Sequence, residues 1–377
     1  MALHTSGTSG LVNTRFFNTF PQNIDSLFVS LYRKNVLKRT LRSFFPINFY
    51  DGSRQRYPRP AQCGDPIGKI VSVKVGNTGA FFQNVVRCGN KWICPTCSNH
   101  FKGQWRNYAV NATQNAMDQN MQVLLLTLTI PHKATDNLGS LLSILTKAWV
   151  DLSRLLKSGV LLRPYGYGGL IRATEVTYGK AHGWHPHFHV LLFLDNPIAS
   201  SDLDTVKISL QKMWTKYLAI RGIILQAGRV KIDVRPIESP KEAGYIFKTQ
   251  DSNTPDHYTP FELIDAIEGR LADIKPNHAK LLIIDFLLQT KHKHFADATK
   301  EIDKFATRPS KLKRKHGGGE EGENQVGAVS LFEIPTKRYR QLQKNTDMVC
   351  EVFILASNKK TLFHAEYIAK EKPLDNN

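Results

Sequence analysis

Two histidines separated by a single residue, His187 and His189, lead into an apolar stretch that ends at Leu194. Successive side chains of a strand point to opposite faces, so both imidazoles would share one face while Phe188 and Val190 occupy the other. Two imidazoles side by side on a rigid strand supply half of a divalent metal site. The spacing therefore predicts metal-assisted chemistry on a phosphate.

Glu175, on the preceding expected strand, is the candidate third ligand. If the hairpin is symmetric about His182, Glu175 lies opposite His189, and directly opposed residues have Cβ atoms about 5 Å apart. Two imidazoles and one carboxylate would hold Mg²⁺ or Mn²⁺ with positions left open for a phosphate oxygen and water. His182 and His185 are rival ligands. The alternative is that all these side chains are ordinary surface residues.

Tyr245 and Lys248 lie three residues apart in an expected helix and would share one helical face. The charge of Lys248 would favour the phenolate, and tyrosine attack on a phosphodiester leaves a phosphotyrosine and a free 3′-hydroxyl. An ordinary tyrosine at a core boundary is the alternative. Glu242 fits a capping box with Ser239, and either Glu242 or Glu238 is a candidate for activating a water.

Apolar periodicity predicts the elements that must position these side chains. The order is strand, helix, strand, strand, helix, strand, with one further helix that holds the tyrosine. This order predicts an α+β protein with a ferredoxin-like antiparallel sheet. The expected strands are 123–130, 170–178, 186–194 and 230–235, and the helices are 138–156, a helix capped by Ser201 or Asp202 that runs to 217, and 239–250.

Four cysteines cluster before this sheet. Cys88, Cys94 and Cys97 have the close spacing that zinc prefers, and Cys63 would complete a four-thiolate site, with His100 as its rival. Because a closed thiolate site leaves no open position, this zinc would be structural. The alternative is scattered buried thiols, which is also the expectation for Cys350.

The chain has 51 Lys and Arg against 32 Asp and Glu, a net charge of +19, which indicates a polyanionic partner. Nucleic acid is favoured over a membrane, because there is no spanning apolar run and no lipidation motif. A cytoplasmic location is expected, because few cysteines and no secretion signal are present.

Composition shifts divide the chain into five expected parts. Helices are expected at 261–274 and 277–288, in the part called the helical extension below. A short basic helix is expected at 32–42. The tail begins with the basic run 311–315 and a Gly/Glu-rich linker at 317–324. The parts are a basic N-terminal region (1–62), a cysteine-rich zinc segment (63–120), a domain that holds the sheet and the tyrosine helix (121–250), the helical extension (251–305), and a basic linker and tail (306–377).

Together these segments resemble the rolling-circle replication initiators of small plasmids, the HUH endonucleases with one nucleophilic tyrosine. The resemblance covers about 88–265 and rests on residues 126–131, 172–178, 185–192 and 244–248, with a further similar segment at 259–264. It implies that His187 and His189 are metal ligands, with Glu175 a plausible third, and that Tyr245 is the nucleophile. Many plasmid members carry a glutamate four residues before the tyrosine, where this chain has Lys241.

The resemblance implies an initiator that nicks one strand of a double-stranded origin, stays linked to the 5′ end and frees a 3′-hydroxyl primer. Its partners would be origin DNA in double- and single-stranded form, a host polymerase and, since the chain has no phosphate-binding loop motif, a host helicase. A related HUH transposase or relaxase is one alternative. A non-catalytic, zinc-stabilised DNA-binding regulator is the other.

Overall fold

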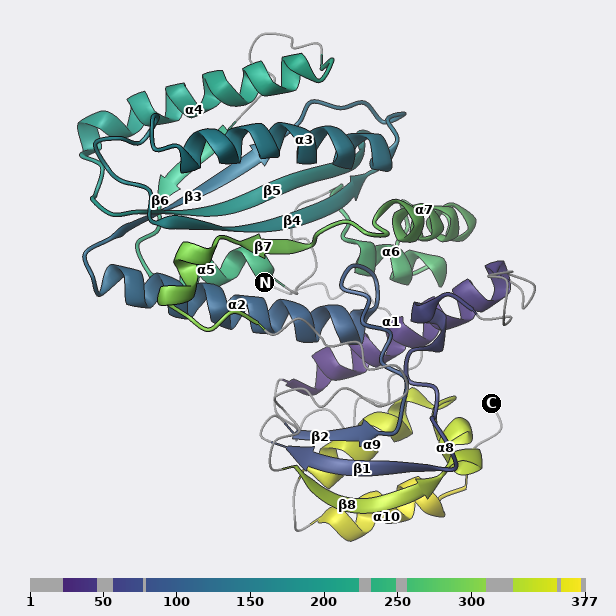
Figure 1. Cartoon of the computed structure of the whole chain (residues 1–377). Helices are drawn as coiled ribbons and strands as arrows, with labels where there is room; N and C mark the ends of the chain where they lie inside the picture. The colour runs from purple at the N-terminus through teal and green to yellow at the C-terminus, as the bar shows by residue number, and fades with distance from the viewer. Residues whose placement is uncertain are drawn as a thin grey trace, which may run out of the picture. The chain divides into compact units, whose positions relative to one another are not determined.

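The structure, a computed structural model, describes residues 23–45, 57–76, 79–223, 232–248, 256–309, 328–357 and 361–373 (Figure 1). The chain divides into two compact units. Unit 1 consists of residues 1–32, 66–85 and 321–377, and unit 2 consists of residues 33–65 and 86–320. All of the candidate site residues lie in unit 2.

Unit 2 contains a five-stranded antiparallel sheet with the order β6-β3-β5-β4-β7. The four expected strands are all present, and β7 adds a fifth along β4. The first four strands have the order of a ferredoxin-like sheet, which confirms the predicted α+β class. The strands are β3 (Gln122–Thr129), β4 (Gly169–Gly179), β5 (Gly183–Leu194), β6 (Ile232–Pro236) and β7 (Ala296–Ala298).

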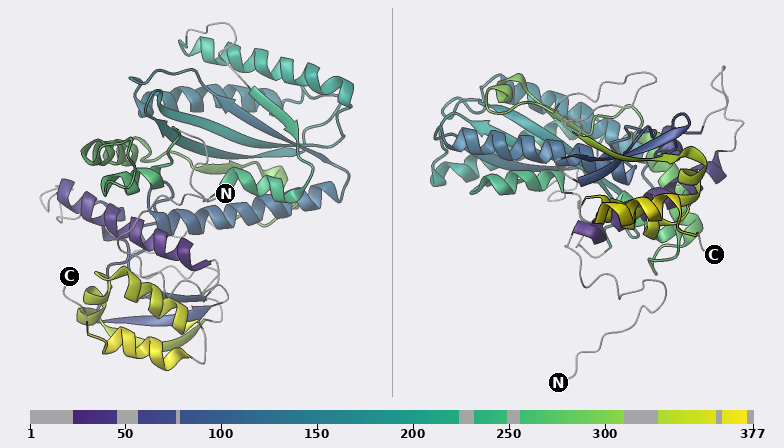
Figure 2. Two further views of the ribbon diagram at one scale, coloured as in Figure 1. Left: turned by 180° about the vertical axis from the view of Figure 1, so that it is seen from behind. Right: turned by 90° about the horizontal axis from the view of Figure 1, so that it is seen from below.

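Successive side chains alternate between the two faces of the sheet, and one set of apolar residues lies on the face opposite to the histidines. Leu126 of β3 pairs with Val190 of β5, and Leu128 pairs with Phe188, so these side chains share one face. Two helices, α3 (Leu138–Lys157) and α4 (Ser200–Ile220), cover that face, and the ring of Trp149 on α3 meets Phe188 edge to face (Figures 1 and 2). The buried apolar face fixes which side of the sheet His187 and His189 can occupy.

The opposite side of the sheet carries helix α2 (Pro95–Met117) and the short segment that follows β6. That segment consists of α5 (Pro240–Ala243), the 3₁₀ helix η3 (Gly244–Phe247) and Lys248, the C-cap of η3. The expected helix 239–250 is therefore wrong in its length and in its second half, and residues 249–250 lie outside the described residues. We call residues 240–248 the tyrosine segment.

The predicted register of the β4–β5 hairpin is wrong by two residues. Glu175 pairs with His187 and not with His189, and the hairpin closes at the pair of Gly179 and Gly183. Gly183 has a φ of +74°, and a Cβ there would lie 2.7 Å from the carbonyl oxygen of Ala134, so only glycine fits this turn. Because a shift of two residues preserves the face, Glu175 still lies on the side of the histidines.

Other helix boundaries differ from the expectations in smaller ways. The residue before α4 is Ala199, so neither Ser201 nor Asp202 is its N-cap. Helix α6 (Pro260–Ile267) stops seven residues before the expected end at 274, and α7 (Pro276–Gln289) is close to its expected range. Helix α1 (Asn23–Phe44) is twice as long as the expected basic helix. Two 3₁₀ helices, η2 (Arg59–Gln62) and η4 (Lys300–Lys304), complete unit 2.

Unit 1 contains a fold of its own that the sequence analysis did not predict. Its antiparallel sheet has the order β2-β1-β8, with β1 (Ile70–Gly76), β2 (Gly79–Gln83) and β8 (Val329–Pro335). Three helices follow β8: α8 (Thr336–Leu342), α9 (Thr346–Ala356) and α10 (Leu362–Lys370). The expected zinc segment thus contributes two strands to this sheet, and much of the expected basic tail is folded.

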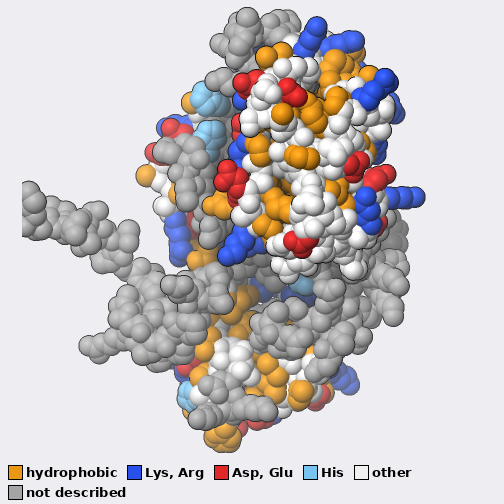
Figure 3. All heavy atoms as spheres, turned by 90° about the vertical axis from the view of Figure 1, so that its left-hand side faces the viewer, with side chains coloured by type: hydrophobic (Ala, Val, Ile, Leu, Met, Phe, Trp, Pro, Cys, Tyr) orange, Lys and Arg blue, Asp and Glu red, His pale blue; other side chains and the backbone are white. Residues whose placement is uncertain are grey.

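The positive charge is concentrated in unit 2. This unit holds 40 Lys and Arg against 23 Asp and Glu, whereas unit 1 holds 11 against 9. On the face shown in Figure 3, basic side chains are scattered and interspersed with acidic ones rather than gathered in one stripe. Within the described part of the chain, no helix has the length and apolarity needed to cross a bilayer.

Candidate functional site

Three side chains converge on one point of the histidine-bearing sheet face. The Nε2 atoms of His187 and His189 lie 3.1 Å and 2.9 Å from the same carboxylate oxygen of Glu175, Oε2. The two Nε2 atoms are themselves 3.1 Å apart. The structure therefore brings together all three residues that the sequence analysis proposed as metal ligands.

The spacing of these three atoms fits a hard divalent cation. With ligand–metal distances of about 2.1 Å, donor atoms about 3 Å apart subtend about 90° at the ion. This is the angle between adjacent ligands of an octahedron, so the three donors would occupy one face and leave the opposite face open. Glu175, His187 and His189 could hold a metal ion.

The other ring nitrogens of both histidines are engaged in contacts that aim Nε2 at the site. Nδ1 of His189 lies 3.2 Å from Oγ1 of Thr127 on β3, and Nδ1 of His187 lies 3.4 Å from the carbonyl oxygen of His185. When Nδ1 carries the proton, Nε2 presents a lone pair to the metal. The sequence analysis missed this role of Thr127, although the cross-strand pairing of β3 with β5 places it directly opposite His189.

The charge state of Glu175, His187 and His189, which we call the triad, suits a cation. Burial raises the pKa of Glu175, but the hydrogen bonds from His187 and His189 outweigh this and hold the pKa well below its usual range. Burial lowers the pKa of His189, which leaves its imidazole neutral. A carboxylate and a neutral imidazole are the forms in which Glu and His side chains bind metals.

The tyrosine segment reaches this site through Lys248. The ammonium of Lys248 lies 3.6 Å from Oε1 of Glu175, on the oxygen that the histidines do not contact. Residues three apart eclipse each other on a 3₁₀ helix, so Tyr245 and Lys248 lie on the same side of η3. Tyr245 is 71 % exposed, which leaves its hydroxyl accessible to a DNA strand.

Glu242 has a structural role in the tyrosine segment. Its carboxylate accepts hydrogen bonds from the backbone N–H groups of Ser239 and Glu238, which forms the expected capping box, and it pairs with Arg235 at 2.6 Å. The pairing with Arg235 lowers the pKa of Glu242. A carboxylate held in this way is a weak candidate for activating water. The neighbouring side chains of Lys241 and Glu238 are both exposed.

The rival residues lie elsewhere. His182 is exposed in the turn between β4 and β5. The ring of His185 lies 5.1 Å from that of His187 and 5.0 Å from that of His132, outside the triad. Burial, followed by the neighbouring histidines, lowers the pKa of His185 to about 3. Tyr258 is a second candidate for the nucleophile, and its hydroxyl donates to Asp273.

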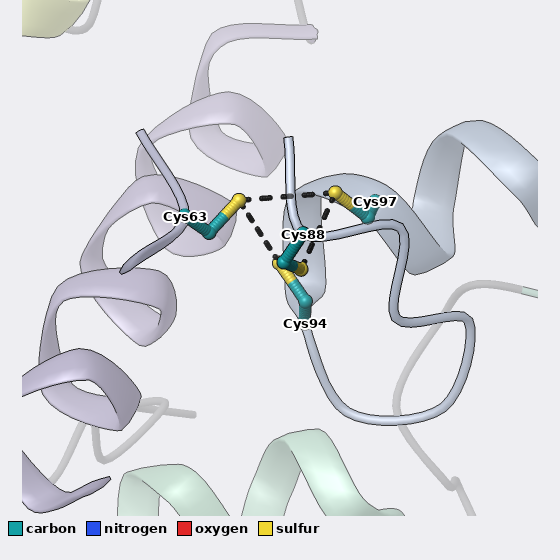
Figure 4. Close-up of side chains that lie close together, drawn as sticks. All are labelled: Cys63, Cys88, Cys94 and Cys97. Atoms are coloured by element: carbon teal, nitrogen blue, oxygen red, sulfur yellow. Dashed lines mark hydrogen bonds between the residues drawn. The ribbon is translucent and has the colours of Figure 1, made fainter. Parts of the chain in front are cut away.

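The four cysteines form a second buried cluster (Figure 4). The Sγ atom of Cys63 lies 3.8 Å from that of Cys97 and 3.5 Å from that of Cys94, and Cys88 lies 3.6 Å from Cys97. These distances are too long for disulfides, so the four cysteines of the cluster are not joined by disulfide bonds. His100 is not among the metal-binding groups found in the described residues.

The sulfur spacing fits a tetrahedral zinc site. With Zn–S bonds of about 2.3 Å, a tetrahedron places its sulfurs about 3.8 Å apart. Hydrogen bonds from the neighbouring thiols hold the pKa of Cys63 well below its ordinary value. The four cysteines could hold a metal ion, and their chemistry favours zinc.

We expect about one zinc ion per chain, held by the cysteine cluster. Replacing Cys97 with serine should remove the zinc and lower the melting temperature by more than 10 °C, because zinc binding at such sites contributes directly to folding. Elemental analysis and thermal unfolding measure both effects. Cys350→Ser is the matched control, since Cys350 is buried in the core of unit 1 and is not part of the cysteine cluster. The assignment would be refuted if wild-type protein contained no zinc and Cys97→Ser had the same melting temperature as wild type.

Comparisons with known proteins find similarity to one family and to two named proteins. Residues 80–222 match the family described as replication protein. A protein named "Protein rep" from Streptomyces lividans is 24% identical over 270 residues, which cover 56% of this chain and 58% of that protein. A protein named "Neomycin resistance protein" from Streptomyces cyanogenus is 27% identical over 154 residues, 34% of this chain and 35% of that protein. No solved structure matches the chain.

The family match contains Glu175, His187 and His189 and three of the four cysteines, but it ends before the tyrosine segment. The chain spans little more than half the length of one relative and about a third of the other. These matches bear out the sequence-based resemblance to plasmid replication initiators: residues 80–222 are similar to the replication protein family.

Proposed function

We propose that this protein initiates plasmid replication by nicking one strand of a double-stranded origin. The observation that carries this proposal is the convergence of Glu175, His187 and His189 with Lys248, which joins the candidate metal site to the segment that holds Tyr245. Similarity to the replication protein family supports the biological role. Origin DNA, a host helicase and a host polymerase are the partners that this role requires.

The reaction is a transesterification that moves the scissile phosphate from the 3′ oxygen of a sugar to the protein. The Oη atom of Tyr245 attacks the scissile phosphorus and its proton passes to solvent. The bond from phosphorus to the 3′ oxygen breaks, and that oxygen leaves with the electron pair and takes up a proton. The products are a 5′-phosphotyrosine and a free 3′-hydroxyl. Because the phosphotyrosine conserves the bond energy, the reverse reaction can rejoin the strand.

Each residue of the site has a distinct part in this reaction. A divalent cation bound by Glu175, His187 and His189 would act as a Lewis acid toward the phosphate oxygens. The ammonium of Lys248 pairs with Glu175 and brings positive charge to the place where a phosphate would sit. The exposed side chain of Tyr245 can meet the phosphorus without rearrangement of a buried core.

A nicking assay tests this function. Supercoiled plasmid that carries the gene with its flanking DNA should be converted to the nicked form by the protein with Mg²⁺ or Mn²⁺, and not with EDTA. The nicked product should carry covalently bound protein. Specific binding of the same DNA without nicking, in any divalent metal, would favour the non-catalytic regulator. Nicking without bound protein would indicate a nuclease that uses water.

Binding of duplex DNA should weaken steeply with salt, because unit 2 carries most of the net charge. Each phosphate neutralised by the protein adds about 0.9 to the slope of log K against log salt. Replacing Lys311, Lys313, Arg314 and Lys315 with glutamine should lower this slope and leave cleavage of a single-stranded oligonucleotide intact. This substitution is preferable to removing the tail, because β8 pairs with β1. A flat salt dependence would contradict the electrostatic account.

A further inference from the structure

Helix α2 connects the cysteine cluster with the tyrosine segment. Cys94 is the residue immediately before the helix, and Cys97 lies in its first turn. From there α2 runs along the histidine-bearing side of the sheet and packs against both α5 and η3 (Figures 1 and 2). The helix thus begins at the cysteine cluster and contacts the tyrosine segment, which reaches the triad through Lys248.

Two basic side chains of α2 donate hydrogen bonds to the end of the tyrosine segment. Arg106 Nη2 donates to the carbonyl oxygen of Phe247 at 3.3 Å, and Lys102 Nζ donates to the carbonyl oxygen of Lys248 at 3.2 Å. The last carbonyls of a helix have no partner within the helix, and they carry partial negative charge. Arg106 and Lys102 therefore satisfy the C-terminal end of η3.

Close packing reinforces these two hydrogen bonds. Gly244, the residue before Tyr245, lies so near to α2 that an added Cβ would be 3.0 Å from Cγ of Arg106 and 3.1 Å from a methyl of Val110. The ring of Trp105 lies 5.6 Å from that of Phe247. The backbone on both sides of Tyr245 is consequently held by α2, although the side chain of Tyr245 is exposed.

We propose that Arg106 and Lys102 are positioning residues for Tyr245 and Lys248. By holding the carbonyls of residues 247 and 248, they fix the rotation of η3 about its axis. Lys248 then meets Glu175, and Tyr245 lies on the same side of η3 as Lys248. This rests on the proposed function of Tyr245. The proposal assigns α2 a part in the cleavage reaction that is separate from DNA binding and from metal binding.

The test compares Arg106→Met with Arg154→Met, which removes the same charge from an exposed position on α3. With saturating single-stranded origin DNA, Arg106→Met should form the adduct ten- to a hundredfold more slowly, since misplacement by about 1 Å can cost about 100-fold. Its affinities for DNA and Mn²⁺ should stay within about twofold of wild type, and Arg154→Met should form adduct normally. Arg106→Lys, which can still donate to Phe247, should recover most of the rate.

Hydrogen exchange gives a measurement that does not depend on cleavage. Amides of residues 244–248 should exchange faster in Arg106→Met than in Arg154→Met, while amides of β5 remain unchanged. Gly244→Ala should produce the same pattern by pushing the segment away from α2, and it serves if Arg106→Met does not fold. If wild type forms no adduct, the proposed function fails, and the exchange rates still decide whether α2 holds the segment.

Three results would overturn the positioning role. Equal adduct rates in Arg106→Met and Arg154→Met would show that Arg106 does not act on Tyr245. A loss of DNA affinity that accounts for the slower adduct formation would make Arg106 a DNA contact. Unchanged exchange of residues 244–248 in both Arg106→Met and Gly244→Ala would show that α2 does not fix the segment.

Discussion

Replacing Tyr245 with phenylalanine is expected to abolish the covalent protein–DNA adduct and to leave folding and DNA binding unchanged. The substitution removes one oxygen atom from a side chain that is 71 % exposed, so little packing is lost. No metal should restore the adduct, because a cation can polarise the phosphate but cannot replace the attacking phenol. Denaturing electrophoresis with origin strands labelled at either end measures the loss, and only the fragment downstream of the nick should carry protein in wild type.

Tyr258→Phe is the matched control for this experiment. Tyr258 lies in the same unit, and its hydroxyl donates to the carboxylate of Asp273, so the substitution also removes one phenolic oxygen. Adduct formation should remain within about threefold of wild type, as expected for a residue outside the reacting centre. An adduct that persists in Tyr245→Phe and disappears in Tyr258→Phe would move the nucleophile to Tyr258 and invalidate the role given to the tyrosine segment.

Removal of either histidine of the triad should abolish nicking by a different route. His187→Ala and His189→Ala each leave only two of the three donors, so binding of Mn²⁺ should fall beyond detection at micromolar concentration, and a high Mn²⁺ concentration should restore part of the activity. Thr127→Val should weaken Mn²⁺ binding by about 10- to 100-fold, the usual cost of losing a partner that orients a ligand. Calorimetry with Mn²⁺ and the nicking assay measure the two effects separately.

His364→Ala provides the control, since His364 lies on α10 of unit 1 and is not part of the Glu175, His187 and His189 group. It should bind Mn²⁺ and nick DNA like wild type. Full metal affinity in His187→Ala and His189→Ala would show that the triad is not the metal site. Full nicking without metal binding would separate the reaction from the triad altogether.

Alternation of apolar and polar residues was enough to predict the face that carries the site. Leu126 and Leu128 of β3 pair with Val190 and Phe188 of β5 on the face covered by α3 and α4, which leaves His187, His189 and Thr127 together on the other side. The register was not predictable to the same degree, because the length of the turn at residues 180–182 depends on local glycine geometry at Gly183. The error of two residues changed the partner of Glu175 and preserved its face.

Unit 1 could not be predicted from local patterns, because its sheet joins distant parts of the chain. Val71 on β1 pairs with Ile334 on β8 across more than 260 residues. The contacts of Arg106 and Lys102 could not be predicted for the same reason, since these residues donate to Phe247 and Lys248 about 140 residues away. Spacing within the sequence reveals neighbours on one helix or strand, but contacts of this kind depend on how elements pack.

The most direct test of the central claim is to identify the amino acid that is bonded to DNA after nicking. Wild-type protein is incubated with a cleavable origin strand and Mn²⁺, the adduct is digested with trypsin and nuclease, and the nucleotide-bearing peptide is sequenced by mass spectrometry. Cleavage after Lys241 and Lys248 gives a peptide of residues 242–248 in which Tyr245 is the single tyrosine. We predict a nucleotide on that peptide, joined through Tyr245. A nucleotide on any other peptide, or nicked DNA with no modified peptide, would contradict the account.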